Sequence, residues 1–489
     1  MTQLRKEFAQ GVFWIGMAKY SGLLINLLVT AILARHVTPS SFGTIAVATV
    51  ILYFLQIFGD LGIGPAIIQY RELSKKQIYS IFTFSFYLGI ILALVFFSLS
   101  SIIADFYEDS KLTTICRILS INLFFYAINV VPNGLMSREK RFKAIGLRTV
   151  SIQIVCGCVA VWGAFHNWDV YALLVTPFFT AVGMFLVNYF NYPQLIVRKI
   201  DIKTLKIISS FSIYQFLFTF CNYFSRNLDQ LIIGKRFSLA ELGFYDKSYR
   251  LMKLPLQNVT SVLNPVIHPI LSTLKDNQEE LCHKNDKLIV IISYFSFPIG
   301  VALYFCAAEV IRIFYGPNWD DAIPVFKILA LSLPLQMILS SSGAIYQASG
   351  KTKHMFINGI INTTCTISGF ILAAIWGQSI EAMAYAWDIT LTINFITSYI
   401  IMYHYTFKSS FLKMPPSLII QLMNSVLVFG ITLFVLKYID IFNAISNVFL
   451  TLALKSFFVI ILTFVFASIF KQYNICDIIL SIYYNRKKR

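Results

Sequence analysis

Long apolar segments recur along the whole chain and limit its possible folds more than any other feature. A helix needs about 20 mostly apolar residues to cross a membrane. Segments of this kind lie near 10–33, 41–66, 78–104, 114–136, 144–165, 170–191, 206–233, 241–271, 288–308, 322–347, 355–376, 380–403, 418–436 and 446–470. Only 13% of the residues are charged, against about 25% in a typical soluble protein. The sequence therefore excludes a soluble domain and predicts an all-α integral membrane protein with about 14 transmembrane helices.

The basic residues alternate between the two sides of this predicted bundle. The chain has 40 Lys and Arg against 23 Asp and Glu. If the N-terminus is cytoplasmic, 25 of the 40 basic residues fall in loops on that side, 6 in the opposite loops and 9 within the segments. Loops rich in Lys and Arg stay on the cytoplasmic side of a membrane. This split predicts that both termini are cytoplasmic and explains the net charge of +17 without a nucleic-acid partner.

Two stretches of the sequence repeat each other at an offset of 200 residues. Residues 31–43 resemble residues 231–243, with Arg35 matching Lys235 and Gly43 matching Gly243. This offset corresponds to six helices, and an even number keeps both copies in the same orientation. We therefore predict two parallel six-helix lobes related by an axis along the membrane normal, with the substrate path between them. The predicted divisions are an N-lobe over 1–200, a C-lobe over 201–404, and two appended helices with a basic tail over 405–489.

The basic residues inside the predicted helices carry the functional information, because a charge within a membrane is costly. We expect four of them to extend their charges to the lipid headgroups, namely Arg117, Arg148, Lys327 and Lys455. Lys19 instead lies about 14 Å along the first helix, and Asp60 lies deep in the second. Lys19 and Asp60 either form a structural pair or line a cavity.

The segment 241–271 has the most informative pattern. Asp246, Arg250 and Lys253 follow at helical spacing and share one face. Lys247 lies beside that face, with Tyr245 and Tyr249 flanking it. The stripe extends too deep to face lipid, so it predicts a watery cavity or a protein partner. The alternative is an interfacial amphipathic stretch whose charges all lie among headgroups.

Further charges are expected to join this stripe. Arg226 and Asp229 are three residues apart on the preceding helix, so they either pair with each other or line the same cavity. The predicted cationic cavity combines Lys19, Arg226, Lys247, Arg250 and Lys253 with Tyr245 and Tyr249, and its carboxylates are Asp60, Asp229 and Asp246. A cleft dominated by one sign of charge concentrates the opposite sign. We therefore predict an anionic ligand whose phosphate oxygens contact Arg and Lys.

No pattern in the sequence points to catalysis. The sequence contains no ATP-binding glycine loop, no zinc-protease helix motif and no nucleophile elbow. The cysteines are scattered and suggest no metal site. We therefore expect a protein without enzyme activity, cofactor or metal. Any uphill transport then uses an ion gradient or a downstream sink, and Asp60 and Asp388 are the candidate sites for H⁺ or Na⁺ coupling.

Short motifs in both halves of the chain form a recognisable set. In the first half they are Gly11-Val-Phe-Trp14, Leu33-Ala-Arg-His-Val-Thr-Pro-Ser-Ser-Phe-Gly43, Asp60-Leu-Gly62 and Ala66-Ile-Ile-Gln69. In the second half they are Arg226-Asn-Leu-Asp-Gln-Leu-Ile-Ile-Gly234, Leu242-Gly-Phe-Tyr245 and Pro255-Leu-Gln-Asn258. Together these motifs resemble the Wzx-type oligosaccharide flippases of the multidrug/oligosaccharidyl-lipid/polysaccharide exporter superfamily, most of all the subgroup with the colanic acid and teichuronic acid exporters. The resemblance covers residues 5 to 405.

The resemblance implies a two-lobe, fourteen-helix fold that opens alternately to either side. It also implies a substrate: undecaprenyl-diphosphate-linked sugar units, moved from the cytoplasmic to the periplasmic leaflet of the bacterial inner membrane for synthesis of O-antigen, capsule or exopolysaccharide. Membrane lipid and the polysaccharide polymerase machinery are the other partners it suggests. The diphosphate is anionic, in agreement with the predicted cationic cavity.

Three alternatives remain open. A multidrug antiporter of the same fold would have a cavity dominated by carboxylates and aromatic rings, whereas cations prevail here. A lipid II flippase would bind the same kind of anionic lipid. A membrane-embedded polymerase or ligase usually needs a large periplasmic loop, and the longest outer loop here spans only residues 309–321.

Overall fold

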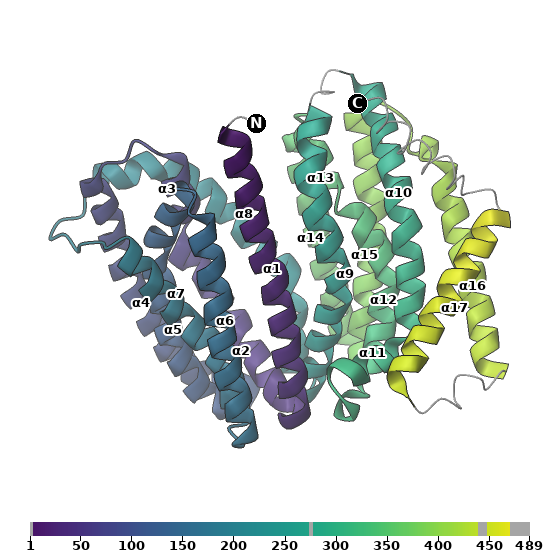
Figure 1. Ribbon diagram of the computed structural model, residues 1–489, viewed down its shortest axis with the longest axis horizontal. Coiled ribbons are helices and arrows are strands. Elements are labelled where there is room, and N and C mark those ends of the chain that lie inside the picture. Colours follow the sequence, from purple (N-terminus) through teal and green to yellow (C-terminus); the bar gives the residue numbers. More distant parts are fainter. Residues whose placement is uncertain (1–2, 273–276, 439–446, 470–489) are drawn as a thin grey trace. The chain divides into compact units, whose positions relative to one another are not determined.

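A computed structural model describes residues 3–272, 277–438 and 447–469. Every predicted segment coincides with a helix of 18 residues or more, and in these ranges all regular secondary structure is helical. The long helices are α1 (Gln3–His36), α2 (Pro39–Asp60), α4 (Lys75–Tyr107), α5 (Lys111–Arg138), α6 (Phe142–Phe165), α7 (Val170–Asn191), α8 (Ile202–Arg236), α9 (Leu239–Ser272), α10 (Gln278–Phe305), α12 (Ala322–Leu339), α14 (Thr352–Trp376), α15 (Ile380–Ile401), α16 (Pro416–Tyr438) and α17 (Val448–Ile469) (Figure 1). The predicted all-α membrane fold is confirmed.

Eleven of the described helical spans are long and apolar enough to cross a membrane. The remaining long helices are α8, α9 and α15, which reach the required length but are more polar. These three helices carry Arg226, Asp246 and Asp388, together with most of the other predicted cavity residues. The helices that depart from a simple apolar composition therefore carry most of the residues for which the sequence predicts a function.

Two predicted segments are interrupted near one end. The segment 41–66 consists of α2 and the short helix α3 (Ile63–Gln69). Leu61 and Gly62 between them have positive φ angles of 44° and 74°, and the Asp60 carboxylate accepts the Gly64 N–H at 3.1 Å. The segment 322–347 likewise divides into α12 and α13 (Ser342–Ala348). Short helices α11 (Ala307–Phe314) and η1 (Pro317–Trp319) precede α12.

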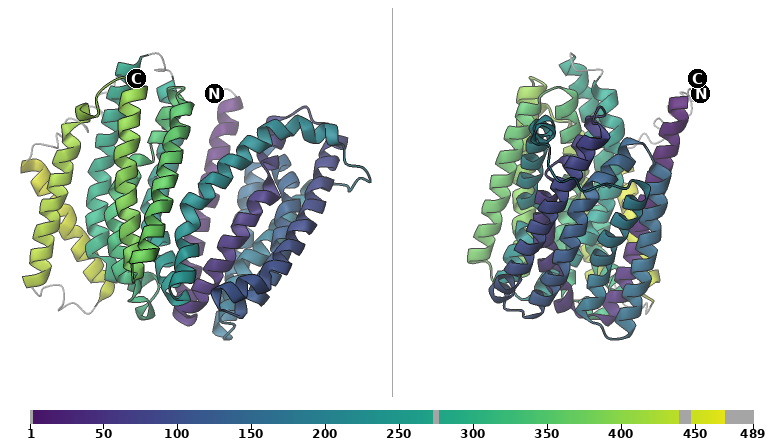
Figure 2. Two further views of the ribbon diagram at one scale, coloured as in Figure 1. Left: turned by 180° about the vertical axis from the view of Figure 1, so that it is seen from behind. Right: turned by 90° about the vertical axis from the view of Figure 1, so that its left-hand side faces the viewer.

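The chain divides into two compact units. Unit 1 comprises residues 1–246 and 314–318, and unit 2 comprises residues 247–313 and 319–489. In unit 1, α5 packs against α4 and α7, and α6 packs against α1 and α7. Figure 2 shows α8 of this unit as one long, curved helix. The predicted lobes, 1–200 and 201–404, were inferred from the sequence repeat and not from packing. Their boundaries stay a prediction.

The repeat at an offset of 200 residues has the same local structure in both copies. Helix α1 ends at His36 and α8 at Arg236, while α2 begins at Pro39 and α9 at Leu239. The hydroxyl of Thr38 accepts the Ser41 N–H at 3.3 Å, and the hydroxyl of Ser238 accepts the Glu241 N–H at 3.1 Å. Hydroxyl caps of this kind stabilise the first turn of a helix.

Unit 2 is built around α10, α12 and α15, with α14 packed against α15. Polar side chains connect α14 and α15: the Asn358 amide donates to the Ser398 hydroxyl at 2.9 Å, and the Asn394 amide donates to the Thr366 hydroxyl at 3.0 Å. Such interhelical hydrogen bonds hold helices together where lipid offers no competing hydrophobic effect. Both appended helices, α16 and α17, pack against α10 (Figure 1).

A buried ion pair joins α17 to α11. The Lys455 ammonium lies 2.6 Å from the Glu309 carboxylate, and the two side chains are only 16% and 10% exposed. The prediction that Lys455 extends to the headgroups is therefore wrong, because a carboxylate within unit 2 compensates its charge.

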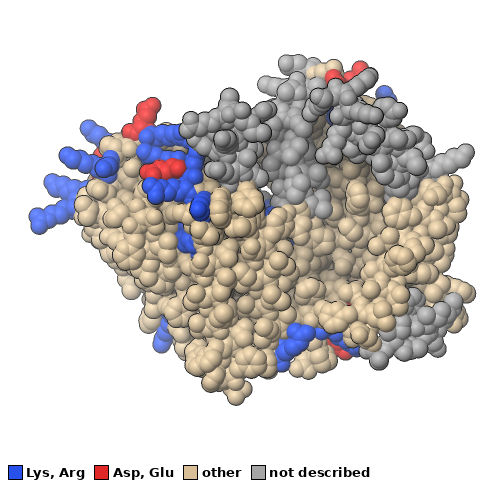
Figure 3. Space-filling view, viewed as in Figure 1, with Lys and Arg blue, Asp and Glu red and all other residues tan. Residues whose placement is uncertain are grey.

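Basic side chains gather at one end of unit 1. Figure 3 shows a group of Lys and Arg at the end of the unit where α3 lies, and a smaller group at the opposite end. The connections at the first end are 70–74, 139–141 and 192–201, which are among the loops predicted to be cytoplasmic. This distribution is the one expected for a membrane protein with a basic cytoplasmic side.

Lys455→Met and Glu309→Gln should each lower the free energy of unfolding by about 3–5 kcal/mol, because each leaves one buried charge uncompensated. The double variant should lose much less than the sum of the two single losses. The wild type, the two single variants and the double variant are purified in detergent and compared by thermal melting, which completes a double-mutant cycle. Additive losses would contradict the ion pair.

Candidate functional site

Two buried carboxylates lie close together where α8 meets the start of α9 in unit 1. Asp229 and Asp246 are each only 1% exposed. The Tyr245 hydroxyl donates to Asp229 at 3.0 Å, and the Gln230 amide donates to Asp246 at 3.4 Å. The structure thus brings together three predicted residues, Asp229, Tyr245 and Asp246, with Gln230 as an unpredicted fourth member.

Tyr245 is fully buried and directed at Asp229. Its ring is therefore enclosed by protein in this conformation. The predicted place of Tyr245 in a ligand-binding cavity stays a prediction for another conformation of the protein.

The basic residues of α9 have different environments in unit 2. Lys247 is 7% exposed and Tyr249 3% exposed, whereas Arg250 is exposed and Lys253 half-buried. The Lys253 ammonium lies 3.7 Å from the centre of the Tyr249 ring, at cation–π distance. Tyr249 in turn packs edge-on against Trp387 of α15, with the ring centres 5.5 Å apart.

Asp388 follows Trp387 and lies among polar groups of unit 2. One oxygen of the Asp388 carboxylate and the indole N–H of Trp387 are buried without a hydrogen-bond partner among the described residues. Nearby on α12, the Gln336 amide donates to the Ser332 hydroxyl at 2.9 Å and lies 3.4 Å from the Met252 sulfur. A buried acidic oxygen with spare hydrogen-bonding capacity is suited to exchange a proton or contact a cation.

The other predicted residues of unit 1 are Lys19, Asp60 and Arg226. Their described contacts do not involve Asp229 or Asp246. Lys19 is exposed on α1, with its ammonium 6.0 Å from the Tyr20 ring centre. Asp60 accepts the Gly64 N–H at the start of α3, and no Lys19–Asp60 ion pair occurs within the described residues. Arg226 is exposed on α8. Of the two roles considered for Lys19 and Asp60, the structural pair is not formed among the described residues, and the cavity role stays a prediction.

The sequence alone missed a close contact between the two copies of the repeat. A Cβ atom added to Gly43 would lie 1.7 Å from the main-chain oxygen of Leu239. A Cβ atom added to Gly243 would lie 2.2 Å from the main-chain oxygen of Pro39. Pro39 and Leu239 are themselves 200 residues apart, so each glycine receives the backbone of the other copy. We call residues 37–43 and 237–243 together the paired-glycine contact. The match of Gly43 with Gly243 in the repeat was the one trace of this contact in the sequence. The match alone does not reveal that the two copies touch each other.

A polar pocket of about 300 Å³ lies beside the paired-glycine contact in unit 1. Lys235 lines it and forms an ion pair with Glu108 at 2.9 Å. The Tyr107 hydroxyl donates to the Leu231 carbonyl at 3.3 Å. The α8–α9 turn is therefore connected to the end of α4 as well as to α2.

Polar pairs outside the spans stabilise the ends of the helices. The Arg312 guanidinium donates two hydrogen bonds to Asp320, at 2.9 and 2.7 Å. These bonds hold the pKa of the Asp320 carboxyl below its usual range. Asp169, in the α6–α7 connection, contacts Ser41 at 2.7 Å and Lys111 at 3.0 Å.

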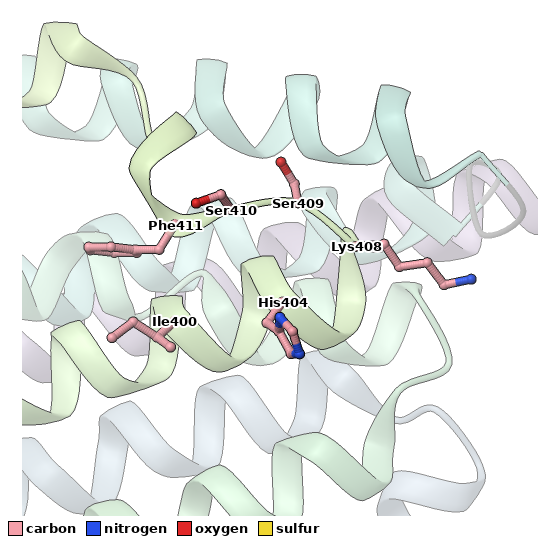
Figure 4. A pocket seen from close by; sticks show the side chains of 6 residues that line it. All are labelled: Ile400, His404, Lys408, Ser409, Ser410 and Phe411. Atoms are coloured by element: carbon pink, nitrogen blue, oxygen red, sulfur yellow. The ribbon is translucent and has the colours of Figure 1, made fainter.

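A larger cavity of about 560 Å³ opens at the end of α15 in unit 2. Its lining includes His404, Lys408 and Phe411, and Figure 4 shows Lys408 extending away from Phe411. None of the lining residues belongs to the predicted cationic cavity. The Asp388 environment, rather than this cavity, is therefore the candidate site of unit 2.

The chain is similar in sequence to a protein family and to several proteins named for polysaccharide synthesis. A family model described as "Polysaccharide biosynthesis protein" matches residues 32–324, more than half of the chain. The lipopolysaccharide biosynthesis protein WzxC of Escherichia coli (strain K12) is 23% identical over 424 residues, which cover 83% of each chain. The teichuronic acid biosynthesis protein TuaB of Bacillus subtilis (strain 168) is 22% identical, covering 81% of this chain and 82% of its own. The succinoglycan biosynthesis transport protein ExoT of Rhizobium meliloti (strain 1021) is 21% identical, covering 77% and 76%.

Solved structures share the fold at low sequence identity. The lipid II flippase MurJ in an inward closed conformation superimposes with a TM-score of 0.74 at 16% identity, covering 94% of this chain and 98% of its own. An inward-facing multidrug transporter of the MATE family gives a TM-score of 0.58 at 14% identity, covering 77% and 92%. At such identities these likenesses establish the fold alone.

Proposed function

The chain belongs to the family of polysaccharide biosynthesis proteins, and on this basis we propose that it is a flippase for lipid-linked oligosaccharides. Its substrate is an undecaprenyl-diphosphate-linked repeat unit, moved from the cytoplasmic to the periplasmic leaflet for synthesis of O-antigen, capsule or exopolysaccharide. The resemblance found in the motifs is confirmed by the family match. The observation that carries the proposal is similarity over about four-fifths of the chain to proteins named for polysaccharide synthesis.

The charges of α8 and α9 support an anionic substrate. Lys247, Arg250 and Lys253 follow one another along α9 within a bundle that is otherwise strongly apolar. We assign to them, with Arg226 and Lys19, the binding of the diphosphate, and to Tyr249 a contact with the sugars. Arg and Lys form charge-assisted hydrogen bonds with phosphate oxygens, which are stronger than those between neutral groups.

We propose alternating access as the mechanism, with the two repeats closing the outer and inner ends in turn. The paired-glycine contact lies at the ends of α1, α2, α8 and α9 that the charge distribution predicts to be periplasmic. It joins the two copies of the repeat through their backbones. In this proposal it is the outer closure, and it separates when the substrate is released.

The proposed setting is the bacterial inner membrane, with both termini cytoplasmic. The protein acts on its substrate without a chemical step and delivers it to the polysaccharide polymerase machinery. Membrane lipid surrounds the polyprenyl tail throughout, because the tail is too apolar to leave the bilayer.

Lipid II transport is the alternative within the same fold. Both substrates contain a polyprenyl diphosphate, so the cationic residues do not distinguish them. A multidrug antiporter is less consistent with the surplus of cations on α9. The intermediate that accumulates without the protein decides between these functions.

Deletion of the gene should cause a lipid-linked polysaccharide repeat unit to accumulate on the cytoplasmic side, measured by mass spectrometry of extracted lipids.

Arg250→Ala should restore export about 10- to 100-fold less well than the wild type, because one charged hydrogen bond contributes about 1.5–3 kcal/mol. Lys327→Ala is the matched control, since Lys327 is a basic residue of the same unit outside the predicted cavity. Its ammonium lies 5.8 Å from the centre of the Tyr304 ring. Accumulation of lipid II would refute the polysaccharide function, and full export by Arg250→Ala would refute the role of Arg250.

Asp388 is the proposed coupling carboxylate, since its buried oxygen Oδ1 has no partner among the described residues, whereas Asp60 is engaged at the start of α3. In proteoliposomes, an imposed pH or Na⁺ gradient should accelerate transport by the wild type and by Asp60→Asn. Asp388→Asn should transport slowly and respond to neither gradient. A normal response of Asp388→Asn, or a loss confined to Asp60→Asn, would contradict this assignment.

Gly43→Ala and Gly243→Ala should each force the paired-glycine contact apart, because the added carbon meets a main-chain oxygen that no side-chain rotation moves. Both variants should label faster with an impermeant maleimide at a cysteine replacing Ala240, and both should lose most transport. Gly16→Ala is the control, since nothing lies within 4 Å of the added carbon. Labelling and transport equal to this control would exclude the paired-glycine contact as a closure.

A further inference from the structure

Arg148 of unit 1 is a charged residue for which the cationic stripe of α9 gives no explanation. It lies on α6, six residues after its start at Phe142, or about 9 Å into the helix. Its guanidinium stays charged at any ordinary pH. The prediction that it extends to the headgroups is wrong, because its side chain is held between α5 and α7.

The contacts of Arg148 are all with neutral groups. Its terminal nitrogen Nη1 donates to the amide oxygen of Asn188, and it lies 3.5 Å from the amide oxygen of Asn133 and 3.6 Å from the sulfur of Met136. Asn188 is fully buried and donates in turn to Asn129 at 2.7 Å. The asparagines orient the guanidinium, but they do not neutralise its charge.

The guanidinium also has unused hydrogen-bonding capacity. Its Nε is buried and has no hydrogen-bond partner within the described ranges of the chain. None of its hydrogen bonds within the described part of the chain is to an Asp or Glu carboxylate. The Arg148 side chain as a whole is half-buried, and a cation taken partly out of water without a counter-charge favours the binding of an anion. The fork of a guanidinium matches the oxygens of a phosphate group.

We propose that Arg148, positioned by Asn133 and Asn188, binds the phosphate of a lipid in the cytoplasmic half of the membrane. The position of Arg148 near the basic end of unit 1 is appropriate for a headgroup that enters from the cytoplasmic leaflet. The phosphate belongs either to a phospholipid or to the isoprenyl diphosphate of the substrate. The second source rests on the proposed function, whereas the first does not.

The test measures binding rather than transport, so its outcome is independent of the flippase assay. The full-length protein in detergent is titrated with farnesyl diphosphate, with dioctanoyl phosphatidylglycerol, and with uncharged farnesol as a blank. Arg148→Gln should weaken binding of at least one phosphorylated lipid tenfold or more, and the lipid affected identifies the source. Arg117→Gln is the matched control, because Arg117 is also an arginine of unit 1 within a span, with its guanidinium 5.0 Å from the Phe97 ring centre.

Asn133→Asp separates a binding role from a merely structural one. The substitution places a carboxylate where the amide oxygen lies 3.5 Å from Arg148, and it therefore supplies the missing counter-charge within the protein. The melting temperature should rise or stay unchanged while lipid binding falls tenfold or more. Unchanged binding of both lipids in Asn133→Asp would overturn the proposal, even if Arg148→Gln fails to fold. Equal affinities of Arg148→Gln and Arg117→Gln for both lipids would overturn it as well.

Discussion

The absence of hydrogen-bond partners in hydrocarbon is the constraint on which the rest of this structure depends. Backbone groups satisfy each other within helices, and the described regular structure is entirely helical. Several buried side chains follow the same rule: Lys455 pairs with Glu309, and Asp229 accepts the Tyr245 hydroxyl. Apolar length therefore determines where the helices are, and polar pairing determines how they pack.

The positions of the helices were predictable from the sequence because apolar length is a local property. The interruption after Asp60 was not, since the residues on both sides of it are apolar. It depends on a left-handed backbone at Leu61 and Gly62 and on a carboxylate that accepts a hydrogen bond at the start of α3. Backbone conformation of this kind leaves only a weak trace in a hydrophobicity pattern.

The partners of the buried charges were the hardest feature to predict. Lys455 and Glu309 are 146 residues apart, and Arg148 and Asn188 are 40 apart, so no helical spacing relates them. Spacing correctly identified Asp229, Tyr245 and Asp246 as residues of interest, but only the packing of α8 against α9 brings Tyr245 to Asp229. Their roles in substrate binding stay predictions, because sequence and geometry identify unusual residues without identifying the ligand.

The repeat supplies a physical reason for the two matching glycines. Two copies that meet through equivalent segments present the same backbone atoms to each other, so a space requirement at Gly43 recurs at Gly243. Contacts of this type are individually weak, at about 0.5–1 kcal/mol for each Cα–H···O interaction. Each glycine meets main-chain oxygens rather than an interlocking side chain. In the proposed mechanism, an outer closure built mainly from such contacts opens for a modest free energy, as alternating access requires.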